Sequence, residues 1–234
     1  MPYQWLLFDV DNTLLDFDQT EALALESNFA QHRLPFPPEA KQRYHQINQS
    51  YWQRLERKEV TPEILRTGRF QDLFDELGVQ FDAELFADSY LAQLGQQAPL
   101  MDGVMALLGE LNGRFQLGII TNGLADVQHP RLEKSGLKPY FSPIIISQEI
   151  GVSKPNPGIF DAAFAQMNQP AKSEVLIIGD SLSSDILGGI NYGIDTCWFN
   201  PNGQTTDLPI TYEIKTLSQL NQILLSTTSG RLSA

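Results

Sequence analysis

Apolar and polar positions follow two different patterns along the chain. A short apolar run near the N-terminus is followed by a long stretch with helical periodicity only, and from about residue 99 apolar runs and helical segments alternate. The apolar runs contain no regular polar positions, which is typical of strands buried on both faces of a parallel sheet. The expected strands are 5–8, 115–120, 144–147, 175–178 and 196–199, and the expected helices between them are 103–111, 126–135, 159–167 and 185–192.

This alternation predicts an α/β fold with a Rossmann-like, doubly wound parallel sheet. The helical stretch interrupts the unit directly after its first strand, which indicates an inserted all-helical cap domain. We predict a core of residues 1–16 and 98–226, a cap of residues 17–97 that determines substrate specificity, and a disordered tail of residues 227–234. Within the cap, Thr61 and Pro62 mark the start of one helix and Gly78 marks its end.

Composition narrows the class of function. The chain has 234 residues, of which 42% are apolar, so it can form a sizeable core. Its 28 acidic and 16 basic residues give a net charge of -12, which argues against binding a nucleic acid polymer or an anionic membrane surface. No apolar stretch approaches the length of about 20 residues that spans a bilayer, and the first residues lack the charged start of a signal peptide. The single cysteine, Cys197, excludes an intrachain disulfide and a cysteine-cluster metal site, so we expect a cytoplasmic protein.

Two aspartates follow the first strand. Asp9 and Asp11 are two residues apart, so in extended backbone both side chains point to the same side of the chain, where their charges repel. A cation would offset this repulsion, and the carboxyl end of a strand in an open α/β sheet is where ligands bind. The alternative is that the two aspartates only open a turn.

Polar groups also follow three later segments of the predicted core. They are the triplet Thr121-Asn122-Gly123, then Lys154 in a loop, and then Asp180 with Ser181 and Asp185. Each by itself could serve a turn, a solvated loop or a helix cap. Because parallel strands have their carboxyl ends at one edge of the sheet, these groups should converge with Asp9 and Asp11. Such a convergence favours a catalytic site over turn chemistry.

In this order, the motifs resemble the four sequence motifs of the haloacid dehalogenase superfamily. The helical segment after the first motif is similar to the cap of the phosphatase branch, and the resemblance covers roughly residues 3–225. A closer similarity, to the pyrimidine 5'-nucleotidase subgroup, lies in residues 68–70, 119–123, 151–157 and 185–191 and in Arg131-Leu132-Glu133. The resemblance implies a phosphoric monoester hydrolase that acts on pyrimidine nucleoside 5'-monophosphates, including modified ones.

The resemblance also implies roles for the residues. Asp9 would be the nucleophile that forms an aspartyl-phosphate, and Asp11 the acid and base that serves the leaving group and then the attacking water. The groups implied to bind the phosphate are Thr121, Asn122, Gly123 and Lys154. Those implied to hold Mg²⁺ are Asp9, Asp11 through its backbone carbonyl, Asp180, and Asp185 either directly or through water.

Asp11 separates reactions within the superfamily. A halide leaving group needs no acid, and the dehalogenase branch typically lacks the second aspartate, so its presence favours hydrolysis of phosphate esters. A small sugar-phosphate phosphatase or a phosphomutase of the same superfamily is the alternative. A non-catalytic binding protein should have lost one of the core groups, yet Asp9, Asp11, Lys154 and Asp180 are all present.

Specificity should lie in the cap, because the leaving group of the substrate points there. Phe17 and Trp52 are candidates for stacking on a base, although aromatic residues at helical spacing are more often core residues. Asn48 and Arg69 are polar candidates, and Arg69 could equally form an ion pair inside the cap. The expected partner is a small phosphate monoester, namely a nucleoside monophosphate, and the expected oligomeric state is a monomer or a weak homodimer.

Overall fold

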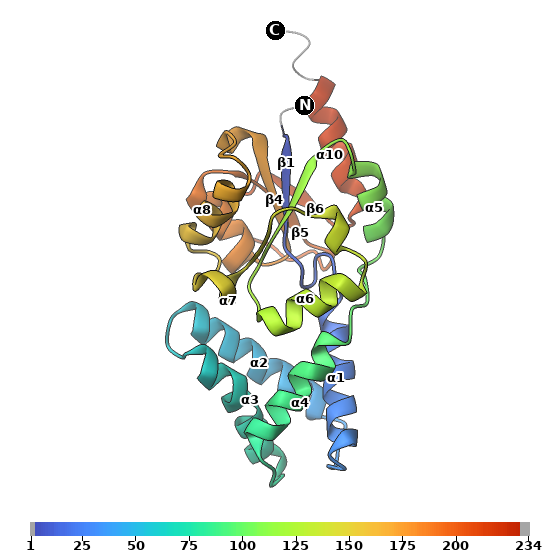
Figure 1. Cartoon of the computed structure of the whole chain (residues 1–234), viewed down its shortest axis with the longest axis vertical. Coiled ribbons are helices and arrows are strands. Elements are labelled where there is room, and N and C mark those ends of the chain that lie inside the picture. The colour runs from blue at the N-terminus through green and yellow to red at the C-terminus, as the bar shows by residue number, and fades with distance from the viewer. Residues whose placement is uncertain (1–2, 230–234) are drawn as a thin grey trace.

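A parallel sheet forms the centre of the computed structural model, which describes residues 3–229 (Figure 1). Within these residues the sheet has six strands in the order β3-β2-β1-β4-β5-β6, and every neighbouring pair is parallel. The strands are β1 (Trp5–Phe8), β2 (Gln116–Thr121), β3 (Ile144–Ile146), β4 (Val175–Gly179), β5 (Asp195–Phe199) and β6 (Tyr212–Ile214). This arrangement confirms the predicted α/β class, with strand order changing direction at β1.

Helices cover both faces of the sheet, which explains why the strands have no regular alternation of polar positions. In β1, Leu6 and Phe8 are buried in one core cluster, and Leu7, between them, is buried in another on the opposite face. The helices of the core are α5 (Val104–Leu111), α6 (Ala125–Lys134), α7 (Ser147–Ile150), α8 (Pro157–Gln166), α9 (Leu187–Tyr192) and α10 (Ser218–Ser229). The core also contains the 3-10 helices η1 (Lys138–Tyr140) and η2 (Lys172–Glu174), and a π-helix, η3 (Leu182–Ile186).

Four helices follow β1 in the chain, before the remaining elements of the core. They are α1 (Phe17–Gln31), α2 (Ala40–Glu56), α3 (Pro62–Leu77) and α4 (Ala83–Gly95). They surround a further apolar cluster, in which Phe29, Phe70 and Phe86 are fully buried and to which the core contributes Leu124 and Val127. Figure 1 shows this four-helix segment together at one end of the molecule, beyond the sheet. It occupies the place expected of a cap.

The signals at the ends of α3 take the predicted form. The Thr61 hydroxyl accepts a hydrogen bond from the Ile64 N–H, Pro62 is the first helical residue, and Gly78 follows the last turn with φ of 64°. Glycine adopts this left-handed conformation without a steric penalty, so it ends the helix at little cost.

Two connections join the four-helix segment to the core, and they run beside each other. The Asp16 N–H donates to the Pro99 carbonyl at 2.9 Å, and the Met101 N–H donates to the Leu14 carbonyl at 3.0 Å. The segment is therefore attached through a paired, two-stranded connection directly after Asp9 and Asp11.

The C-terminal part of the core contains two elements that the sequence pattern did not predict. Strand β6 has three residues, too few for a recognisable pattern, and α10 follows it. Helix α10 continues through Ser229 and so overlaps the first residues of the predicted tail, 227–234; residues 230–234 lie outside the described residues. Among residues 3–229, no helix is both long enough and apolar enough to cross a membrane.

Candidate active site

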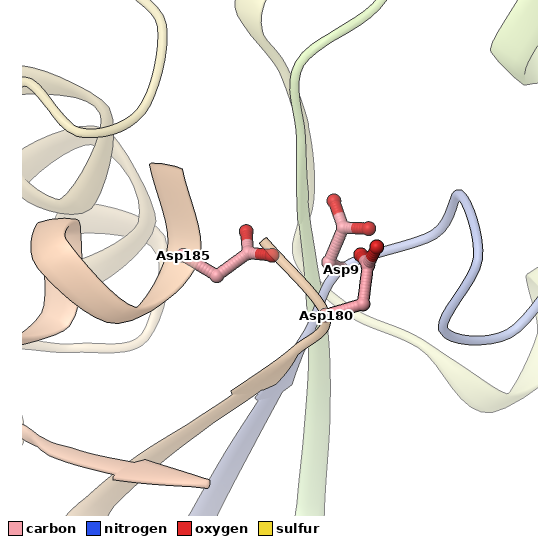
Figure 2. A group of neighbouring side chains, drawn as sticks. All are labelled: Asp9, Asp180 and Asp185. Atoms are coloured by element: carbon pink, nitrogen blue, oxygen red, sulfur yellow. The ribbon is translucent and has the colours of Figure 1, made fainter. Parts of the chain in front are cut away.

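Three carboxylates meet at the edge of the sheet that faces the four-helix segment. Asp9 follows β1, Asp180 follows β4, and Asp185 lies in η3, and each offers an oxygen within 4.8 Å of the others. Figure 2 shows Asp9 and Asp180 at neighbouring strand ends with the Asp185 carboxylate directed toward them. Asp9 and Asp180 are 171 positions apart in the chain, and Asp180 and Asp185 are 5 positions apart. The fold thus brings together groups that are distant in the sequence.

Strand register explains the position of the first two carboxylates. Phe8 pairs with Ile178 in the parallel ladder, and the Asp9 N–H donates to the Ile178 carbonyl at 2.9 Å. Asp9 and Asp180 therefore leave adjacent strands within one residue of each other. Among the described strands, the strand order changes direction between β1 and β4, the two strands that Asp9 and Asp180 follow. Open α/β sheets bind ligands at such a point.

The position of Asp185 depends on a close approach to the backbone. Its Oδ2 accepts a hydrogen bond from the Ser181 N–H at 3.0 Å. A Cβ atom at Gly179 would lie only 2.3 Å from the same oxygen, closer than real atoms come. The glycine at the end of β4 therefore leaves the space that the carboxylate fills.

Lys154 places a buried cation among these carboxylates. Its Nζ lies 2.5 Å from Asp9 Oδ1 and 2.6 Å from Asp185 Oδ1, and it donates to the Ile120 carbonyl at 2.7 Å. The lysine side chain is only 1% exposed. The backbone of Lys154 is held in turn by Asn122, whose side chain donates to the Lys154 carbonyl at 2.9 Å and accepts from its N–H at 2.8 Å.

Burial and mutual repulsion govern the protonation of the cluster. Burial, followed by the charges of Asp185 and Asp11, raises the pKa of Asp9 to about 7, although Lys154 acts in the opposite direction. Burial and then the charges of Asp9 and Asp185 raise the pKa of Asp180 well above its ordinary value. Burial alone would lower the pKa of Lys154, but the carboxylates of Asp185 and Asp9 together raise it, so the lysine is charged.

The donor set fits a hard divalent cation. All three groups offer carboxylate oxygens, which Mg²⁺ prefers, and these carboxylates repel one another with the ammonium of Lys154 beside two of them. A divalent cation held by Asp9, Asp180 and Asp185 would relieve this repulsion. The Asp11 carboxylate does not belong to this group of three, so the predicted Asp11 contact through the backbone carbonyl stays a prediction.

Asp11 is instead bound by helix α6. Its Oδ1 accepts from Arg131 Nη1 at 2.6 Å, and its Oδ2 accepts from Gln128 Nε2 at 2.9 Å. Neither residue is predicted from the sequence as a site residue; Arg131 lies in a segment that resembles the pyrimidine 5'-nucleotidase subgroup. Their spacing of three residues places them on one face of α6, but nothing in the sequence shows that this face meets Asp11.

The predicted phosphate-binding triplet begins with Thr121, the last residue of β2. Asn122 and Gly123 line the cavity beside the carboxylates, whereas Thr121 is fully buried and does not line it. The Thr121 hydroxyl accepts from Gln128 Nε2 at 2.9 Å, and the Gly123 N–H donates to the Ser147 hydroxyl at 3.1 Å. In this conformation the triplet is therefore engaged by neighbouring side chains.

A cavity of about 260 Å³ joins the carboxylates to the four-helix segment. Of the predicted specificity residues, Phe17, Trp52 and Arg69 line it. Asn48 does not line it but is buried behind Arg69, whose Nη1 donates to Asn48 Oδ1 at 2.7 Å. Trp52 also lines a second, larger hollow of about 690 Å³ that lies against the loop before α8.

Comparisons with known proteins agree with this geometry. The chain is 39% identical to YfnB of Bacillus subtilis over 95% of both chains. It is 35% identical to the pyrimidine 5'-nucleotidase YjjG of Escherichia coli, over 96% of this chain and 99% of YjjG. It is 37% identical to the pyrimidine 5'-nucleotidase PynA of Streptococcus pneumoniae over 94% of both chains. A crystal structure of YfnB bound to magnesium superposes with a TM-score of 0.91, covering 96% of this chain and 99% of the other.

The family comparison covers most of the chain. Residues 3–193 match the model of haloacid dehalogenase-like hydrolases, and this span includes β1, the four-helix segment, and all three carboxylates. On this evidence, the chain belongs to the haloacid dehalogenase-like hydrolase family.

Proposed function

We propose that this protein is a Mg²⁺-dependent phosphomonoesterase that hydrolyses pyrimidine nucleoside 5'-monophosphates, including modified ones, through an aspartyl-phosphate. The observation that carries the proposal is the contact of Lys154 with both Asp9 and Asp185 in the lining of a cavity. A buried ammonium there offsets the charge that accumulates when an anionic nucleophile meets an anionic phosphate.

The proposed reaction has two steps. In the first, an Asp9 carboxylate oxygen bonds to phosphorus, the bond from phosphorus to the ester oxygen breaks, and the leaving alkoxide takes a proton from Asp11. In the second, water loses a proton to Asp11 and attacks phosphorus, which releases inorganic phosphate and restores Asp9. Bound Mg²⁺ would supply positive charge to the phosphoryl oxygens and so reduce their repulsion with Asp9.

The nucleoside portion is proposed from the relatives and from the lining of the cavity. YjjG and PynA are pyrimidine 5'-nucleotidases, and each aligns with nearly the whole chain. The cavity combines aromatic Phe17 and Trp52 with the buried guanidinium of Arg69. An aromatic surface suits a flat base, and a guanidinium suits its carbonyl oxygens.

The first experiment is a phosphate-release screen of the purified protein with Mg²⁺ and with a chelator. The panel contains pyrimidine and purine nucleoside monophosphates and small sugar phosphates, and Asp9→Asn serves as the control. We expect release from pyrimidine nucleotides with Mg²⁺, and none from Asp9→Asn. Activity in Asp9→Asn would contradict the covalent mechanism. A preference for sugar phosphates would overturn the nucleotidase assignment alone, and transfer of the phosphoryl group to a sugar instead of water would indicate a phosphomutase.

The same panel tests the specificity residues. Arg69→Ala and Asn48→Ala should both raise KM for pyrimidine nucleotides, because Asn48 holds the Arg69 guanidinium in place. Unchanged kinetics of both variants across the panel would remove these residues from the proposed site.

A further inference from the structure

The reaction above leaves two buried side chains on α6 without a role. Arg131 is 0% exposed and Gln128 is 1% exposed, and both bind the carboxylate of Asp11. Because one donor contacts Oδ1 and the other contacts Oδ2, the pair determines the rotation of the carboxylate as well as its position. A single ion pair would leave that rotation free.

The two donors are also joined to each other and to the end of β2. Arg131 Nη1 donates to Gln128 Oε1 at 2.8 Å, and Gln128 Nε2 donates to the Thr121 hydroxyl at 2.9 Å. Each bond limits the rotation of the side chains that form it. The network therefore holds Asp11 in a defined relation to the strand end that precedes Asn122 and Gly123.

Arg131 in addition contacts the start of the four-helix segment and the connection that returns from it. Its Nε donates to the Gln97 carbonyl at 3.2 Å, in the connection that returns from α4. Its guanidinium carbon lies 5.4 Å from the centre of the Phe17 ring, at the start of α1. The arginine that holds Asp11 is thus in contact with the first residue that enters the four-helix segment and with the stretch that leaves it.

We propose that Arg131 is a positioning residue for the reaction: assisted by Gln128, it orients the Asp11 carboxylate for proton transfer to the leaving oxygen. Through Gln97 and Phe17 it makes that orientation depend on the position of the four-helix segment. This inference rests on the proposed function. A purely stabilising role is a poor explanation, since an ion pair with one fully buried partner contributes little net stability compared with apolar packing.

The leaving group of the substrate distinguishes positioning from structural support. A nucleoside alkoxide needs a proton to leave, whereas p-nitrophenolate leaves as a stable anion. In Arg131→Lys, the charge is kept but one ammonium cannot reproduce the bonds to Asp11, Gln128 and Gln97. We expect kcat/KM to fall about 100-fold for a nucleoside monophosphate and less than about tenfold for p-nitrophenyl phosphate.

A matched control and a double variant complete the test. Arg114→Lys, on the exposed surface beside Phe115, makes the same substitution and should leave both substrates unaffected. Asp11→Asn should show the same dependence on leaving group as Arg131→Lys. Adding Arg131→Lys to Asp11→Asn should cost little more, because residues that act through one another are not additive.

The outcomes separate this inference from the function on which it rests. Equal losses on the two substrates, or full additivity in the double variant, would overturn the positioning role. If the unmodified protein hydrolyses neither substrate, the proposed function itself fails. If Arg131→Lys does not fold, as judged by thermal unfolding, Arg131→Gln takes its place, since a neutral amide can still donate to Asp11; it must show the same dependence on leaving group.

Discussion

Asn122 and Lys154 exchange two hydrogen bonds, one in each direction. The Asn122 side-chain amide donates to the Lys154 carbonyl at 2.9 Å, and its oxygen accepts from the Lys154 N–H at 2.8 Å. The end of β2 is thereby joined to the loop before α8, and the Lys154 ammonium is directed at Asp9 and Asp185. The Asn122 side chain thus acts on the site through the placement of the lysine.

Asn122→Ala should release this loop. Loss of two hydrogen bonds is expected to lower the free energy of unfolding by about 1–3 kcal/mol, and displacement of Lys154 should lower kcat by at least about tenfold. Asp82→Ala is the matched control, because its carboxylate also accepts two backbone hydrogen bonds, at the start of α4. Chemical denaturation and phosphate release measured on both variants check this. Equal kcat values in the two variants would contradict the role of Asn122.

Mg²⁺ should stabilise the folded protein. The proposed cation site exists only when Asp9, Asp180 and Asp185 converge, so Mg²⁺ at a concentration about 100 times Kd should add about 2.7 kcal/mol to the free energy of unfolding. Thermal unfolding with and without Mg²⁺ measures this without reference to activity. In Asp180→Asn the Mg²⁺-dependent increase in Tm should be mostly lost. An equal increase in both proteins would place the cation elsewhere.

Gly179→Ala should disturb the site sterically. The new methyl group would lie 2.3 Å from Asp185 Oδ2, so we expect a loss of stability of about 1–3 kcal/mol and a weaker effect of Mg²⁺ on Tm. Gly109→Ala is the control: a Cβ there meets nothing within 4 Å, and alanine should stabilise helix α5 by about 0.5–1 kcal/mol. Thermal unfolding should therefore shift in opposite directions for the two variants. A shift in the same direction would show that Gly179 has room for a side chain.

Stability should also depend on pH through His45. The hydrogen bond with Glu21, at 2.9 Å, raises the pKa of His45 above its ordinary value of 6.5, with partial burial opposing it and the charges of Glu21 and Asp18 adding to it. Because the pKa of His45 is higher in the folded protein, its interaction with Glu21 contributes fully to the free energy of unfolding below about pH 6.5. This contribution is lost as pH rises through the folded pKa. The Tm difference between the unmodified protein and His45→Gln should shrink over that rise. A constant difference, or an NMR titration of His45 at or below 6.5, would contradict this.

Local sequence patterns were sufficient for the fold class. The apolar runs at 5–8 and 175–178 are strands, and their lack of polar positions follows from burial on both faces of the sheet. The gathering of Asp9, Asp180 and Asp185 could be expected for the same reason, since parallel strands end at one edge. Strand β6 was missed because its three residues are too few to show a period, and α10, which follows it, was not predicted either.

The sequence by itself therefore determined the architecture, the position of the site and the kinds of group present in it. Only the tertiary structure decided which groups touch: that Arg131 and Gln128 hold Asp11, that Asn122 holds Lys154, and that Asn48 lies behind Arg69 and not in the cavity. The physical reason is the sequence separation over which each property acts. Hydrophobic period and turn chemistry are local properties of the chain, whereas these contacts join residues brought together by packing, and Arg131 and Asp11 are separated by 120 positions.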